Sequence, residues 1–172
     1  MRLKMFGKKS LSELLFYCTW FIAFGYCLFL LFIAFSFITD TFLSINDNRF
    51  AIEIPFTGSF VKGQYESEVI LSIIVFFVFY ILFFYTLSLI FKTFKAEILF
   101  TKIAIKHLKY FAILNLFSPF VYVIILFIVG YSIGLSDLST VFLHIMLGIF
   151  AWFIIAIFKE GFQLQEENEL TI

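Results

Sequence analysis

The chain contains 172 residues, of which 63% are hydrophobic and only 14% are charged. Soluble domains are about half apolar and about a quarter charged, so this composition excludes an ordinary soluble domain and indicates an integral membrane protein. Basic and acidic residues number 12 each, and this balance by itself indicates neither an acidic nor a basic partner.

The N-terminal sequence MRLKMFGKKS is basic and leads into an apolar run, as in a signal peptide. The run is too long for a signal peptide, and no small-residue cleavage site follows it near FSFITDTF. We therefore predict an uncleaved membrane span over residues 14–38. Cys18 and Cys27 lie on opposite faces of this span and cannot bridge each other. We interpret them as small apolar filler, with a link between two copies as the alternative.

Residues 40–68 form the only sizeable segment that we expect outside the membrane. Phe50, Ile52 and Ile54 alternate with other residues ahead of the turn sequence TGS, which predicts a short β-hairpin, and Pro55 suits an edge position. A hairpin alone is marginally stable in water, so we expect it to pack on the helix ends or on a second copy. We interpret the segment as a connecting loop, with a ligand-sensing lid as the alternative.

Three further apolar segments, residues 69–91, 110–133 and 138–158, contain no Asp, Glu, Lys or Arg and are long enough to cross the hydrocarbon core. Because lipid cannot satisfy backbone polar groups, all four spans are predicted to be helices, despite their many β-branched and aromatic residues. The predicted fold is all-α: a single transmembrane domain over residues 1–172, formed by a bundle of four helices.

Basic residues are distributed unevenly between the connections. Most precede the first span or join the second span to the third: Arg2, Lys4, Lys8, Lys9, Lys92, Lys95, Lys102, Lys106 and Lys109. Only Arg49 and Lys62 lie between the first and second spans. Because Lys and Arg are retained on the cytoplasmic side, both chain ends are predicted to be cytoplasmic and residues 40–68 extracytoplasmic. Residues 159–172 then form an acidic cytoplasmic tail.

Few polar residues lie inside the predicted spans, where polar groups are costly and often functional. The intramembrane candidates are Asn115, Ser118, Pro119 and His144. We interpret His144 as a neutral histidine bonded to a neighbouring helix, with a pH sensor as the alternative. Pro119 is expected to kink the third span, and Asn115 to link two helices, with a gating hinge as the alternative.

No metal-ligand cluster, phosphate-binding loop or nucleophile motif is present in the sequence. The two histidines, His107 and His144, belong to opposite sides of the predicted membrane and cannot share a haem. We therefore predict no enzymatic activity, no cofactor and no metal site. The cytoplasmic connection is also too short to read a nucleic acid groove, so direct nucleic acid binding is not expected.

The connection between the second and third spans, residues 92–109, is called the linker below. On a continuous helix, Lys102, Lys106 and Lys109 form a basic stripe on one face. We expect this stripe either to reach lipid phosphates or to bind an acidic protein surface. The candidate docking residues of the tail are Gln165, Glu166, Glu167, Asn168 and Glu169. Tail and stripe are expected to pair weakly, and the alternative is a tail that only caps and solubilises the last helix.

The linker and the tail carry a family resemblance. The tail sequence EGFQLQEENELTI after an apolar span, and the linker sequence FKTFKAEILFTKIAIKHLKYFAIL with its Phe100–Thr101 pair, resemble the YoaS-like family of bacterial four-span membrane proteins. That family is a domain of unknown function, often encoded beside a small Cro/CI-like helix-turn-helix regulator. The resemblance implies a bacterial inner-membrane protein with such a regulator as its cytoplasmic partner.

Two functions follow from these patterns. The first is a non-enzymatic regulatory or sensory membrane protein that tethers or releases a small helix-turn-helix transcription regulator through linker and tail. The alternative is a small channel or transporter component, which lines its path by forming a homo-oligomer and uses Asn115, Pro119 and His144.

Overall fold

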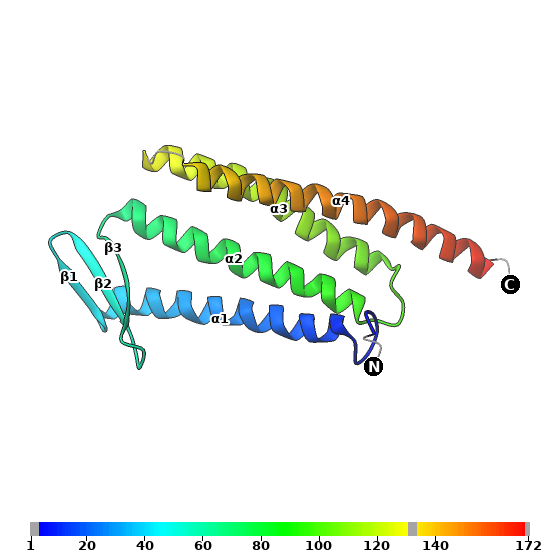
Figure 1. Ribbon diagram of the computed structural model, residues 1–172, viewed down its shortest axis with the longest axis horizontal. Helices are drawn as coiled ribbons and strands as arrows, with labels where there is room; N and C mark the ends of the chain where they lie inside the picture. The colour runs from blue at the N-terminus through cyan, green and yellow to red at the C-terminus, as the bar shows by residue number, and fades with distance from the viewer. Residues whose placement is uncertain (1–3, 131–133, 171–172) are drawn as a thin grey trace. The chain divides into compact units, whose positions relative to one another are not determined.

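The computed structural model describes residues 4–130 and 134–170, without the side chains of residues 129, 169 and 170. Its elements in chain order are α1 (Leu11–Thr39), β1 (Leu43–Asn46), β2 (Arg49–Ile54), β3 (Ser59–Gln64), α2 (Ser67–Phe94), α3 (Lys102–Val129) and α4 (Leu135–Leu170) (Figure 1). Within these residues, four helices are long and apolar enough to cross a membrane. By the length and composition of its helices, the chain is a multi-pass membrane protein.

Each helix begins before the apolar segment that predicts it, and α1, α2 and α4 also end beyond theirs. α3 begins at Lys102 because Thr101 caps it: the Thr101 hydroxyl accepts a hydrogen bond from the backbone N–H of Ala104 at 3.1 Å. It ends where Gly130 adopts a left-handed conformation, with φ of 70°. The expected end of this span at Ile133 lies outside the described residues.

α4 shows the largest extension, because it continues through the polar tail to Leu170. Gln, Glu and Leu dominate this tail, and all three favour the helical conformation in water. The described part of the tail is therefore a continuation of the last span as a helix.

The chain folds as two compact units, Ala23–Ile81 and the combination of Met1–Ile22 with Leu82–Ile172. The first unit contains an antiparallel sheet in the order β1-β2-β3. Phe50 and Ile52 of β2 are buried with Ile33 of α1, so one face of the sheet packs on helix. The alternation along β2 thus marks a buried face.

The sheet has three strands, whereas the sequence suggests a two-stranded hairpin or a loop. The difference arises because Leu43–Asn46 pairs with β2, with Leu43 opposite Ile52. Leu43 packs beside the buried residues of β2, which gives this short strand a reason to form. Pro55 lies in the turn after β2 and not in an edge strand.

In the second unit, α3 and α4 pack along each other around small side chains. Ala104 and Ala112 of α3 and Ala151 of α4 are buried. Gly148 allows an especially close approach, because a Cβ atom there would lie 2.7 Å from Cγ of Leu116. Small residues at a helix crossing let backbones come together, as expected for helices in lipid.

Candidate functional site

An open groove of about 630 Å³ lies beside the C-terminal part of α4. One side chain of the linker and one face of α4 line it: Phe100, Ile157, Glu160, Gly161, Leu164, Gln165 and Asn168. Ile157, Gly161, Leu164 and Asn168 recur every three or four residues, so they share a face of the helix. The groove therefore continues the apolar stripe of the last span into the polar tail.

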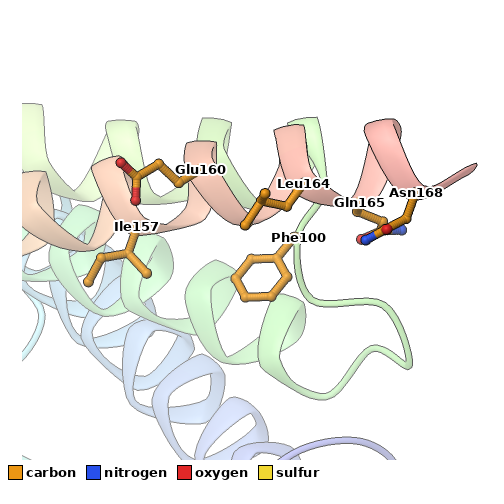
Figure 2. A pocket seen from close by; sticks show the side chains of 7 residues that line it. Phe100, Ile157, Glu160, Leu164, Gln165 and Asn168 are labelled. Atoms are coloured by element: carbon orange, nitrogen blue, oxygen red, sulfur yellow. The ribbon is translucent and has the colours of Figure 1, made fainter. Parts of the chain in front are cut away.

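The groove has an apolar middle and polar ends. Figure 2 shows Ile157 and Leu164 flanking the Phe100 ring, with Glu160 near one end and Gln165 and Asn168 near the other. The side chains of Ile157 and Leu164 are 61% and 60% exposed. Ile157 lies at the end of the apolar span, whereas Leu164 lies beyond it, next to amide groups.

Phe100 docks on α4 because residue 161 is glycine. A Cβ atom at Gly161 would lie 2.6 Å from Cδ1 of the Phe100 ring, which is too close for any other residue without a shift of the linker. The Phe100 ring also meets the Phe158 ring edge-on, with centroids 5.2 Å apart. Gly161 and Phe158 thus hold the linker against the last helix and form one wall of the groove.

The basic stripe of the linker lies on the first turns of α3, and all three of its lysines are exposed. The Lys102 ammonium lies 5.4 Å from the centroid of the Phe162 ring on α4. The Lys106 ammonium lies 5.7 Å from the centroid of the Tyr110 ring. Linker and tail therefore meet through a cation–π contact, in addition to the Phe100 ring contacts.

The predicted docking residues of the tail divide into two groups. Gln165 and Asn168 line the groove, whereas Glu166 and Glu167 are exposed on the rest of the helix surface. The side chain of Glu169 lies outside the described residues. The docking residues predicted from the sequence include Gln165 and Asn168 of the groove lining but not Ile157, Gly161 or Leu164, although the helical spacing of these three residues was a usable signal.

The described residues before α1, 4–10, are called the N-terminal segment below, and they lie against the end of α2. The backbone N–H of Gly7 donates to the carbonyl of Phe94 at 3.0 Å, and Lys8 pairs with Glu97 at 3.1 Å. Lys95 is held between the Glu13 carboxylate at 3.8 Å and the Phe16 ring at 4.5 Å. N-terminal segment, linker and α4 tail thus gather at one end of their unit.

A polar pair is buried between α3 and α4. Asn115 Oδ1 lies 2.8 Å from His144 Nδ1, and the Asn115 amide donates to the Phe111 carbonyl at 2.9 Å. Asn115 is fully buried and His144 is 6% exposed. The Phe83 ring covers His144 edge-on at 5.6 Å. The structure therefore joins two of the four intramembrane candidates in one interhelical contact.

The other two intramembrane candidates lie on the next turn of α3. Pro119 has no N–H, so the carbonyl of Asn115 loses its usual helical donor. The Ser118 hydroxyl is buried without a hydrogen-bond partner among the described residues. His107 is separate from this group, because its Nδ1 lies 3.0 Å from the Thr93 hydroxyl of α2. The two histidines thus serve different helix contacts.

Among residues 4–130 and 134–170, no group of three or more His, Cys, Asp or Glu side chains is placed to hold a metal ion. No family model, no curated protein and no solved structure matches the chain. The class defined by the structure itself is a multi-pass membrane protein with four candidate spans, a small sheet and an open groove beside its last helix.

Proposed function

We propose that this chain is a non-enzymatic regulatory membrane protein that docks a small cytoplasmic protein in the groove beside α4. The observation that carries the proposal is the exposure of Leu164 on the part of α4 beyond the apolar span, along the same face from Ile157 at the end of that span. A large exposed apolar stripe with polar ends is typical of a protein-binding surface. The resemblance to the YoaS-like family supports a small helix-turn-helix transcription regulator as the partner.

The proposal requires the groove to face the cytoplasm. N-terminal segment, linker and tail lie together, and most of the lysines belong to the first two. Lysine-rich connections are retained on the cytoplasmic side during insertion. We therefore place both chain ends in the cytoplasm of a bacterial inner membrane, and the sheet on the opposite side.

The groove also indicates which partner segment fits. An amphipathic helix can place an aliphatic side chain between Ile157 and Leu164, against the Phe100 ring. Glu160, and the exposed Glu166 and Glu167 on the same helix, favour basic side chains flanking that anchor. Gln165 and Asn168 supply amide groups that can bond to its polar edge.

The test is binding of the full chain, in nanodiscs, to the helix-turn-helix protein encoded by the neighbouring gene. Leu164→Gln removes the apolar anchor but keeps a good helix former, and we expect it to weaken binding by at least about tenfold. Gln163→Ala, one position along on the exposed surface, is the matched control and should change binding less than about twofold. Absence of binding by the unaltered chain, or equal effects of the two variants, would refute the proposal.

The alternative function, a small oligomeric channel or transporter component, has less support from the geometry. A channel of this kind needs polar side chains that face a path for water or solute. Asn115 and His144 instead bond to each other and are buried within α3 and α4 of one chain. Their contact is suited to holding two helices together.

A further inference from the structure

The two turns of the sheet differ in polarity. The β1–β2 turn consists of Asp47 and Asn48, and both residues are polar and exposed. The β2–β3 turn contains Pro55 and Phe56, and the side chain of Phe56 is completely exposed. An aromatic ring that covers nothing in its own chain points to a contact outside it.

The β2–β3 turn is closed by hydrogen bonds and leaves the Phe56 ring exposed. The backbone N–H and the hydroxyl of Thr57 both donate to the Ile54 carbonyl, at 3.2 and 2.9 Å. The Thr57 hydroxyl accepts from the backbone N–H of Ser59 at 3.1 Å. Phe56 occupies the third turn position with φ of 67°, where glycine or asparagine is favoured. A bulky ring there costs conformational free energy, so stability of the turn alone does not explain it.

The sheet folds back along the end of α1. Asp40 and Phe42 have positive φ values of 55° and 64°, which reverse the chain after the helix. The Phe42 ring then packs 5.9 Å from the ring of Phe32, which is about 10 Å before the end of α1 at the usual helical rise. Phe42 is also hydrogen-bonded to β2, since its backbone carbonyl accepts from the backbone N–H of Glu53 at 2.9 Å. The end of β2 that leads to Phe56 is therefore beside the last turns of α1.

Figure 1 shows the same arrangement: the β2–β3 turn reaches back alongside the C-terminal turns of α1, and the β1–β2 turn lies beyond the end of the helix. These turns of α1 present apolar side chains outward, and Phe35 and Ile38 are 50% and 81% exposed. Such a surface belongs in lipid when the helix crosses a membrane. The aromatic turn thus lies beside the apolar last turns of α1, and the polar turn lies beyond them.

We propose that the β2–β3 turn inserts Phe56 into the lipid interface next to α1, so that the sheet is anchored to the membrane surface. The partner is a lipid surface because the turn continues the apolar face of α1, and aromatic rings are favourable at the boundary between headgroups and acyl chains. The proposal holds for either side of the membrane and does not depend on the docking function.

The experiment uses the full chain with Trp20→Phe and Trp152→Phe, reconstituted in phosphatidylcholine–phosphatidylglycerol nanodiscs. Phe56→Trp reports on the aromatic turn, and Asn48→Trp on the polar turn is a matched control because Asn48 also has a positive φ, 59°. We expect lipids brominated near the headgroup to quench the fluorescence of Phe56→Trp at least about threefold more than that of Asn48→Trp. Iodide in the water should show the opposite order.

Two outcomes would overturn the proposal. Strong quenching of Phe56→Trp by iodide would place the turn in water. Protection from both iodide and brominated lipid would place the ring against protein, such as a second copy of the chain.

A second measurement keeps the test valid if Phe56→Trp fails to fold. Ser59→Cys is a small change at the same turn, and a spin label attached there, with Cys18→Ala and Cys27→Ala, reports its surroundings. Accessibility to oxygen above that to a water-soluble nickel complex would support insertion. The reverse order would overturn it.

Discussion

Large apolar side chains are buried in the sheet but exposed on the C-terminal part of α4. In the sheet, Phe50 and Ile52 are 1% and 0% exposed, because α1 and α2 supply neighbouring rings and aliphatic groups. On α4, Ile157 and Leu164 are about as apolar but 61% and 60% exposed. The first surface is therefore covered within the chain, whereas the described residues leave the second uncovered.

The largest expected effect is a difference in stability between variants of these two surfaces. We expect Phe50→Ala to destabilise the sheet by about 3–5 kcal/mol, because it removes a buried ring and leaves a cavity. Leu164→Ala, at an exposed position, should change stability by less than about 0.5 kcal/mol. Hydrogen exchange of the strand amides and of the α4 amides in detergent measures both. A comparable loss in the two variants would mean that Leu164 is already covered within the chain.

A second variant tests whether the unit that contains the open groove is closely packed elsewhere. Gly148→Ala places a Cβ atom 2.7 Å from Cγ of Leu116 and 3.1 Å from the backbone nitrogen of Leu116. We therefore expect the free energy of unfolding to fall by about 1–3 kcal/mol. Gly25→Ala is the control, because no atom lies within 4 Å of its added Cβ and alanine favours a helix. Unfolding in mixed micelles measures both. Equal stabilities would show that α3 and α4 are as loosely packed as the groove.

The smallest effect concerns the polar pair in the α3–α4 contact. Asn115→Leu leaves the His144 ring without its amide partner, and we expect the free energy of unfolding to fall by about 1–2 kcal/mol. A double-mutant cycle with His144→Leu should give a coupling energy of about 0.6 kcal/mol, as is typical of such pairs in membranes. A coupling energy of zero would contradict the direct contact and would reopen a separate role for His144.

The four spans were predictable from the sequence, because uninterrupted apolar blocks of sufficient length have few alternatives to a helix in lipid. The alternation in β2 was also visible. Strand β1, Leu43–Asn46, was not visible in the sequence, because it is short and forms only where its partner β2 positions it. The apolar half of the groove was missed because the linker sequence does not reveal that Phe100 lies on Gly161, far along the chain.

The sequence by itself determined that this is a multi-pass membrane protein with an acidic, helix-favouring tail. These properties depend on local composition and period, which act over a few helical turns. Only the tertiary structure decided that Asn115 meets His144, that the linker packs on α4, and that Phe56 is exposed beside α1. Each of these depends on segments distant in the chain coming together, and no local pattern of residues specifies such an approach.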